Sequence, residues 1–148
     1  MNLNLRRTKL EDYELLYELA SLCKPLELHD KYTYWVILSY FNDVSFILED
    51  NKKPIGFITG LYNEDTGFIW QIGIIPEYRQ KNFSNLLIDA VCLSFRYKNL
   101  NNIEVTIAKD NKNSFYAFNN YCNKNGLKLI EVGQALNEIK YRLGDFNE

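Results

Sequence analysis

Three apolar segments that follow one another with only short turns between them most constrain the fold of this 148-residue chain. The segments read VSFILE (44–49), IGFITGLY (55–62) and FIWQIGII (68–75), and the turns between them read DNKKP and NEDTG. Runs rich in Ile, Phe and Val that are separated by Asn, Asp, Gly and Pro are typical of β-strands joined by hairpin turns. The pattern therefore predicts an antiparallel meander of three strands.

The segments around this meander predict further helices and strands. The predicted elements are, in order, a strand at 3–9, a helix from about residue 10, a helix at 31–41, the meander, a helix at 83–97, a strand at 102–108, a helix at 113–126 and a hairpin at 127–143. Thr8 is expected to cap the first helix, in which Leu15, Leu16, Leu19 and Leu22 form one apolar stripe. A meander that leads into β-α-β-α favours a single α+β domain over 1–148, with helices on both faces of a mixed sheet.

The composition excludes several classes of function. A formal charge of −2 gives no general attraction to nucleic acid, and no apolar run approaches the roughly 20 residues of a membrane span. The three cysteines, Cys23, Cys92 and Cys122, have no CxxC spacing, and the chain has a single histidine. This pattern argues against a disulfide framework, a zinc or other metal site and a histidine-based triad. We expect a cytoplasmic protein.

The stretch IIPEYRQKNFSNLLIDAV (74–91) has the form of a phosphate-binding strand–turn–helix without the usual glycines. An apolar strand leads to Pro76, a basic turn follows, and an amphipathic helix begins at Phe83. Such a helix N-terminus can hold a pyrophosphate group. The same pattern is equally typical of an ordinary strand–helix connection whose basic residues face water.

Over nearly its full length the chain resembles the GNAT (Gcn5-related N-acetyltransferase) superfamily. The resemblance implies a mixed, mostly antiparallel sheet of about seven strands with about four helices, and acetyl-CoA bound where the fourth and fifth strands splay apart. The family's Arg/Gln-x-x-Gly-x-Gly/Ala turn corresponds to RQKNFS, with Arg79, Asn82 and Ser84 at the motif positions. Asn tolerates positive φ better than most residues, so we expect the loop to survive with acetyl-CoA affinity reduced by about tenfold.

A narrower resemblance is to the L-2,4-diaminobutyrate acetyltransferases of ectoine biosynthesis. The segments that carry it are PLELHDKYTY, Phe68-Ile69-Trp70-Gln71, the set Glu104, Thr106, Asn111, Ser114 and Phe118, and the terminal pair Glu138 and Arg142. The chain departs from that family's pattern at Glu27, His29, Asp30 and Ala135. These departures fall where the acceptor would sit, so they bear on the acceptor more than on the reaction.

The resemblance implies a set of site residues on each side of the splay. Cofactor contacts are expected from Ile72, Gly73, Ile74, Arg79, Gln80, Lys81, Asn82, Phe83, Ser84, Asn111 and Phe118. Acceptor contacts are expected from Glu27, His29, Tyr32, Tyr34, Trp70, Gln71, Thr106 and Glu138, with catalytic roles for Glu138, Trp70 and Tyr32. The amine would attack the thioester directly, without a covalent enzyme intermediate.

Several of these residues also have structural interpretations. Gly73 either lets the cofactor approach the backbone or marks a bulge, and Asn111 either binds pantetheine or caps a helix. Trp70 and Gln71 are expected to alternate sides of their strand, so that only one faces the acceptor; Trp70 suits either a cation–π wall or the core. Glu138 holds or deprotonates the amine, or is a solvated charge.

The remaining expectations concern three aromatic residues. Tyr32 and Tyr34 do not share a helix face, and we expect Tyr32 to face the substrate and Tyr34 to be partly structural. Phe118 stands where many GNAT enzymes have a tyrosine that protonates the leaving thiolate, a role for which no dedicated acid is required, because a thiol with a pKa near 8.5 is a fair leaving group.

The resemblances and the departures from them leave three functions open. The first is acetylation of a small diamino acid of the 2,4-diaminobutyrate type. The second is acetylation of a diamino-acid unit or other amine in a larger molecule, such as a peptide antibiotic. The third is a GNAT-fold binding module with weakened catalysis. The expected partner is a small-molecule amine, with a homodimer as the possible assembly and neither nucleic acid nor membrane as a partner.

Overall fold

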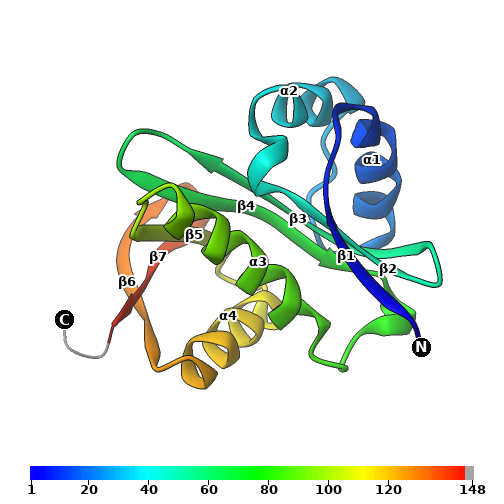
Figure 1. The fold of residues 1–148 in the computed structure, drawn as a ribbon. Coiled ribbons are helices and arrows are strands. Elements are labelled where there is room, and N and C mark those ends of the chain that lie inside the picture. Colours follow the sequence, from blue (N-terminus) through cyan, green and yellow to red (C-terminus); the bar gives the residue numbers. More distant parts are fainter. Residues whose placement is uncertain (146–148) are drawn as a thin grey trace.

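The predicted meander forms one part of a mixed sheet in the computed structural model, which describes residues 1–145 (Figure 1). The elements are β1 (Leu3–Arg7), η1 (Leu10–Asp12), α1 (Tyr13–Leu22), α2 (Lys31–Phe41), η2 (Asn42–Val44), β2 (Phe46–Asp50), β3 (Lys53–Tyr62), β4 (Thr66–Ile74), η3 (Pro76–Tyr78), α3 (Phe83–Tyr97), β5 (Asn102–Ala108), α4 (Lys112–Lys124), β6 (Leu127–Ala135) and β7 (Glu138–Asp145).

Within the described residues, the seven strands lie in the order β1-β2-β3-β4-β5-β7-β6. Every neighbouring pair is antiparallel except β4 and β5, which are parallel. Helices α1 and α2 lie together on one side of the sheet, and α3 and α4 lie on the other (Figure 1). The predicted fold class, an α+β domain with a mixed, mostly antiparallel sheet between helices, is confirmed.

The turns of the meander have the conformations that their residues favour. Asn51 and Lys52 join β2 to β3 with φ angles of 50° and 71°. Two consecutive left-handed residues match the twist of the flanking strands in a tight hairpin, and Asn is among the residues that accept this conformation. The turn therefore holds β2 and β3 in the register that buries Ile47, Leu48 and Phe57.

Helix α3 covers the meander because β3 and β4 present glycines to it. The Phe95 ring lies so close to Gly67 that an added Cβ there would be 2.5 Å from the ring, and at Gly60 it would be 3.0 Å away. Phe95 is fully buried, as are Leu87 and Val91 on the same helix face. Small residues in the strands thus set how closely α3 packs, and α3 in turn fixes where its N-terminus lies.

The start of the first helix differs from the prediction. Thr8 does not cap it, because its hydroxyl donates to the carbonyl oxygens of Asn42 and Ser45, at 3.1 and 3.2 Å. The carboxylate of Asp12 accepts a hydrogen bond from the Lys9 N–H instead, at 2.7 Å. The expected apolar stripe also ends early, since Leu22 is 56% exposed.

Within residues 1–145, no helix combines the length and the apolar character needed to cross a bilayer.

Candidate active site

The parallel pairing of β4 and β5 stops half-way along both strands. The paired residues run from Thr66 opposite Asn102 to Ile69 opposite Val105. Beyond that point β4 continues to Ile74 and β5 to Ala108. The two strands therefore part, and the backbone at the parting edge of β4 is left facing a cavity rather than a neighbouring strand.

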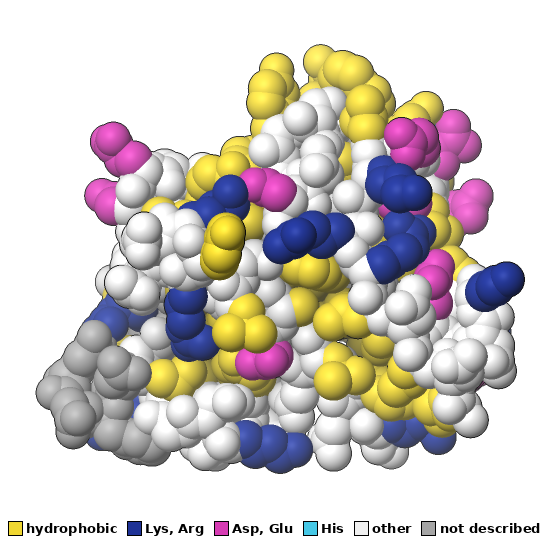
Figure 2. All heavy atoms as spheres, viewed as in Figure 1, with side chains coloured by type: hydrophobic (Ala, Val, Ile, Leu, Met, Phe, Trp, Pro, Cys, Tyr) yellow, Lys and Arg dark blue, Asp and Glu magenta, His cyan; other side chains and the backbone are white. Residues whose placement is uncertain are grey.

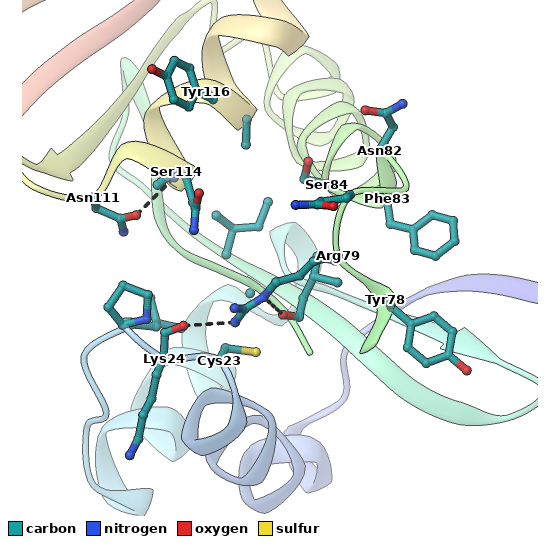
Figure 3. A pocket seen from close by; sticks show the side chains of 18 of the residues that line it. Cys23, Lys24, Tyr78, Arg79, Asn82, Phe83, Ser84, Asn111, Ser114 and Tyr116 are labelled. Atoms are coloured by element: carbon teal, nitrogen blue, oxygen red, sulfur yellow. Dashed lines mark hydrogen bonds between the residues drawn. The ribbon is translucent and has the colours of Figure 1, made fainter. Parts of the chain in front are cut away.

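A first cavity, of about 350 Å³, lies between β4, the N-terminus of α3 and the N-terminus of α4 (Figure 3). Nine of the eleven residues predicted to contact the cofactor line it: Ile72, Gly73, Ile74, Arg79, Gln80, Asn82, Phe83, Ser84 and Asn111. Its charged side chains are Lys24 and Arg79, and no Asp or Glu is among the described residues that line it. We call it the basic cavity.

The loop between β4 and α3 is held in place by two side chains. The Arg79 guanidinium donates to the carbonyl oxygens of Ile74, at 2.9 Å, and Lys24, at 3.0 Å (Figure 3). The Tyr78 hydroxyl, which points away from the cavity, donates to the Asp50 carboxylate at 2.8 Å. Arg79 thus anchors the loop as well as lining the cavity, and part of its donor capacity is committed to the protein.

The N-terminus of α3 opens into the basic cavity. Asn82 precedes the helix with φ 62° and ψ 22°, the left-handed conformation that glycine supplies most readily. Gln80 also has a φ of 62°. The first turn of α3 contains no acidic residue, and Asn82 makes no side-chain capping hydrogen bond. The first N–H groups of this 15-residue helix therefore form an anion-attracting end beside Ser84.

Gly73 is required by its close packing against Cys23 at the end of α1 and Phe57 of β3. A Cβ at Gly73 would lie 2.8 Å from Cys23 Sγ and 3.0 Å from Phe57 Cε1. The bulge in this strand is at a different place, since the register of β3 and β4 shifts between Thr59 and Gly60. Gly73 is therefore not the bulge residue, and it lines the basic cavity through its backbone.

Helix α4 contributes residues that the sequence reasoning missed. Asn113, Tyr116, Ala117 and Asn120 line the basic cavity opposite α3. Their spacing of three, four and seven residues places them on one helix face, which is the signal that could have found them. Asn111 caps the helix, because its side-chain oxygen accepts a hydrogen bond from the Ser114 N–H at 3.1 Å (Figure 3).

A second cavity, of about 510 Å³, lies on the other side of the parting. Of the predicted acceptor residues, it is lined by Glu27, His29, Trp70, Gln71, Thr106 and Glu138. Its acidic groups are Glu27 and Glu138, and no Lys or Arg is among the described residues that line it. We call it the acidic cavity. The two cavities share five lining residues, which are Pro25, Leu26, Ile72, Asn111 and Ser114.

A β-bulge places Trp70 and Gln71 on the same side of the sheet. Thr59 pairs with Gln71 and Gly60 pairs with Ile69, so Trp70 is the extra residue of β4. Consecutive residues at a bulge no longer alternate strictly between faces. Both side chains meet Tyr34: the Trp70 ring centroid is 5.8 Å from that of Tyr34, and Gln71 is hydrogen-bonded to it. The predicted alternation of these two residues is therefore corrected.

Gln71 connects the strand to the loop between α1 and α2. The Tyr34 hydroxyl donates to Gln71 Oε1 at 2.9 Å, and Gln71 Nε2 donates to the Glu27 carbonyl oxygen at 2.7 Å. Tyr34 is fully buried, and burial raises the pKa of its hydroxyl. Tyr34 lines neither cavity and acts on the acidic cavity through Gln71.

Tyr32 is placed differently from the sequence expectation. It is 70% exposed, stacks on Trp35 with ring centroids 6.0 Å apart, and lines neither cavity. Figure 2 shows hydrophobic side chains standing out over α2, the helix that carries the exposed Tyr32 and Trp35. Asp30 likewise turns toward its own helix, where its carboxylate accepts hydrogen bonds from the N–H and hydroxyl of Thr33.

The wall of the acidic cavity combines aromatic and carboxylate groups. The His29 ring lies 4.8 Å from the Trp70 ring, and His29 Nε2 is 3.8 Å from the Glu27 carboxylate. Glu138 begins β7 and is paired with Ala108 at the end of β5. The Glu27 side chain, 81% exposed, lies at the mouth of the cavity, while Glu138 is half-buried in its wall.

Two residues predicted to contact the cofactor lie outside the basic cavity. Lys81 is exposed and lines neither cavity. Phe118 is fully buried and lines the acidic cavity. Tyr116, which is 63% exposed, lines the basic cavity, whereas the buried Tyr121 donates its hydroxyl to Asp89 at 2.9 Å.

Comparison with known proteins fits this geometry. The family model of the acetyltransferase (GNAT) family matches residues 13–120. The chain belongs to the GNAT family. The resemblance found from the sequence is thereby confirmed, and the parting of β4 and β5 is the feature of the GNAT fold that it implied.

Named relatives of this GNAT chain include two L-2,4-diaminobutyric acid acetyltransferases. That of Chromohalobacter salexigens is 28% identical over 77% of this chain and 62% of its own length. That of Streptomyces coelicolor is 27% identical over 97% of this chain and 93% of its own length. The matched part of the chain thus spans less than two thirds of the first of these relatives.

Among solved structures, the chain has the fold of the diaminobutyrate acetyltransferase EctA from Paenibacillus lautus, which was solved in complex with its substrate L-2,4-diaminobutyric acid and coenzyme A. The TM-score is 0.84, with 22% sequence identity over 98% of this chain and 96% of that one.

The two cavities of this GNAT chain differ in charge. Lys24 and Arg79 line the basic cavity, although the Lys24 side chain runs away from it in Figure 3, and Glu27 and Glu138 line the acidic one. The shared wall at Ile72, Asn111 and Ser114 is apolar or neutral. The arrangement can hold an anionic ligand and a cationic ligand next to each other, with their ends meeting at the parting of β4 and β5.

Proposed function

We propose that the protein is an N-acetyltransferase that transfers the acetyl group of acetyl-CoA to a primary amine. The observation that carries the proposal is the pair of cavities of opposite charge that meet where β4 and β5 part. Acetyl-CoA is a polyanion and an alkylamine is a cation at neutral pH, so each substrate matches one cavity.

The basic cavity suits acetyl-CoA by the chemistry of its donors. The N–H groups at the start of α3, with Asn82 and Ser84, would hold the pyrophosphate. The uncommitted donors of Arg79 add positive charge. The backbone of β4 from Ile72 to Ile74 would lie along the pantetheine and offer an N–H to the thioester carbonyl oxygen.

The acidic cavity would hold the acceptor and take up its proton. An alkylamine with a pKa near 10 is only about one part in a thousand neutral at pH 7, so a base must remove a proton before attack. Glu138 is the first choice for this role, with Glu27 at the mouth and Trp70 as an aromatic wall for the ammonium group. The names of the relatives indicate a 1,3-diamine unit of the 2,4-diaminobutyrate type as the acceptor.

Direct attack would then complete the transfer. The amine nitrogen forms a bond to the thioester carbonyl carbon, the carbon–sulfur bond breaks, and the sulfur leaves as a thiolate that gains a proton. The only cysteine among the described residues that line either cavity is Cys23, and burial raises the pKa of its thiol to about 11. A thiol with this pKa is protonated at pH 7 and is a poor acetyl carrier.

A larger acceptor is the second candidate. The acidic cavity has a volume of about 510 Å³, and its Glu27 side chain is 81% exposed. An open cavity of this size accommodates an amine that is part of a larger molecule, such as a peptide. The binding-module interpretation is supported less well, because a non-catalytic module has no need of two cavities with complementary charge.

Substitution at Ser84 tests the proposal. Ser84→Asp places a negative charge in the first turn of α3, where it stabilises the helix but repels pyrophosphate. We expect the dissociation constant of acetyl-CoA to rise at least about tenfold by calorimetric titration, with no fall in melting temperature. Ser84→Asn is the neutral control and should bind nearly as the wild type does. Equal acetyl-CoA affinity in all three proteins would refute this assignment of the basic cavity.

We further propose that the protein is cytoplasmic and that it forms a homodimer. Cys23, Cys92 and Cys122 are free and buried, which suits a reducing compartment such as the cytoplasm. A homodimer remains a prediction, and sedimentation of the purified protein over a range of concentrations tests it.

A further inference from the structure

We infer that the acceptor of this protein is a 1,3-diamine unit without a free carboxylate, rather than a free diamino acid. The inference rests on the proposed function and concerns what the acidic cavity recognises. A free diamino acid brings two ammonium groups and one carboxylate. The acidic cavity presents Glu27 and Glu138 for the ammonium groups, while no Lys or Arg lines it among residues 1–145.

The two cations of β7 opposite this part of β5 do not line the acidic cavity. Lys140 lies opposite Thr106 in the sheet, but its ammonium group is 3.0 Å from Glu104 Oε1 and is paired there. Arg142 lies opposite Glu104, two residues farther along β7. Neither Lys140 nor Arg142 lines the cavity. The wall of the acidic cavity therefore receives no lysine or arginine side chain from the described part of β7.

The remaining cations belong to other surfaces. Lys109 and Lys112, which flank the start of α4, are exposed and line neither cavity. Lys24 and Arg79 line the basic cavity, where Arg79 is bound to two carbonyl oxygens. A carboxylate in the acidic cavity would consequently meet two like charges without a lysine or arginine partner in the wall.

His29 does not replace such a cation. Its Nε2 is 3.8 Å from the Glu27 carboxylate, and its ring packs on Trp70. A protonated His29 would therefore already have an anionic partner. The protein also has only this one histidine.

The neutral groups of the wall suit an amide better than a carboxylate. Thr106, Ser114 and Asn137 line the cavity with hydroxyl and amide groups, which donate hydrogen bonds to a carbonyl oxygen without supplying charge. A diaminobutyryl unit in amide linkage would present a neutral carbonyl there. A simple diamine would present no oxygen at all and would keep both contacts with Glu27 and Glu138.

Three matched acceptors test this inference. They are L-2,4-diaminobutyrate, its primary amide and 1,3-diaminopropane, which share the 1,3-diamine and differ at the carboxylate. We expect kcat/KM, measured by release of the CoA thiol, to be at least about tenfold higher for the amide and for the diamine than for the free acid. The two carboxylate-free compounds differ in amine basicity, so a gain that they share reports on the carboxylate.

The possible outcomes distinguish a failure of this inference from a failure of the proposed function. An equal or higher kcat/KM for the free acid overturns the inference and leaves the acetyltransferase standing. Failure to acetylate any of the three overturns the acceptor class of the proposed function as well. A gain for the amide but not for the diamine would select the amide-linked unit within the inferred class.

Charge-removing variants provide a second readout. Glu27→Gln and Glu138→Gln each remove a like charge, so the preference for the amide over the free acid should shrink by several-fold in both, even where total turnover falls. Glu64→Gln removes the same charge from the exposed turn between β3 and β4 and is the matched control. An unchanged preference in both cavity variants would contradict the inference.

Discussion

At the scale of single residues, the Tyr34 hydroxyl has a positioning role that can be separated from substrate contact. It is buried, and it holds the Gln71 amide that in turn holds the Glu27 backbone. Removing the hydroxyl would leave Gln71 Oε1 without this donor in a buried place, where a lost hydrogen bond typically costs about 1 kcal/mol or more. The loop that carries Glu27 and His29 would then be less firmly placed.

Tyr34→Phe is therefore expected to raise the KM for the acceptor several-fold, while the dissociation constant of acetyl-CoA stays unchanged. Its free energy of unfolding should fall by about 1 kcal/mol, measured in urea. Tyr32→Phe, assayed in parallel, distinguishes the two tyrosines. A rise in KM for Tyr32→Phe alone would favour the original sequence interpretation and contradict the positioning role.

Sequence reasoning could identify single residues where the signal is local. Asn82 was expected to accept a left-handed backbone in place of glycine, and its φ is 62°. The orientation of Trp70 and Gln71 could not be read in this way. It depends on a bulge, and the bulge is defined by pairing with Thr59 and Gly60 on another strand.

At the scale of elements, Arg6 joins the first strand to its neighbours. Its guanidinium donates to the Asp12 carboxylate of η1, at 2.9 and 3.1 Å, and to the Glu49 carboxylate of β2, at 3.2 Å. Burial alone would raise the pKa of Asp12, but the hydrogen bonds from Arg6 and the Lys9 N–H outweigh it and lower that pKa. This network fixes β1 and the start of α1 against the meander.

Arg6→Gln should reduce the free energy of unfolding at pH 7 by about 2 kcal/mol, since charged hydrogen bonds are lost. The folded-state pKa of Asp12 lies below its unfolded value near 3.9, so this stabilisation is complete above about pH 4 and disappears as the pH falls through the folded pKa. Urea unfolding at a series of pH values should show the difference from wild type narrowing in acid.

The matched control for this experiment is Arg7→Gln. Arg7 lies over the Phe46 ring at 5.9 Å and is exposed, so its loss should cost less and show no comparable acid dependence. Equal effects of both variants at every pH would contradict the role given to the Arg6 network.

The bounds of elements were predictable where apolar spacing is continuous. The helix at 83–97 and the strand at 102–108 have the predicted limits, because their buried faces repeat regularly along the chain. The start of α1 was not predictable, since the Thr8 hydroxyl is taken by carbonyl groups more than thirty residues away. The acceptor side of the site likewise required the tertiary structure, which brings residues of the α1–α2 loop onto β4.

At the scale of the whole molecule, the two cavities share a wall, so both substrates should be bound together before the transfer. Initial rates at several concentrations of acetyl-CoA and amine are expected to give intersecting double-reciprocal lines. Intact mass spectrometry after incubation with acetyl-CoA alone should show no acetyl adduct on the protein. Parallel lines together with such an adduct would indicate a covalent intermediate and contradict direct attack.

The separation of charge between the cavities also makes the protein a convenient starting point for engineering. Under the proposed function, acceptor preference depends on a few positions of the α1–α2 loop and the start of β7, such as Glu27 and Glu138, which line the acidic cavity. The helix end that faces the basic cavity lies on another element, α3. A library that varies only the first group can therefore be screened for new amines with one unchanged acetyl donor.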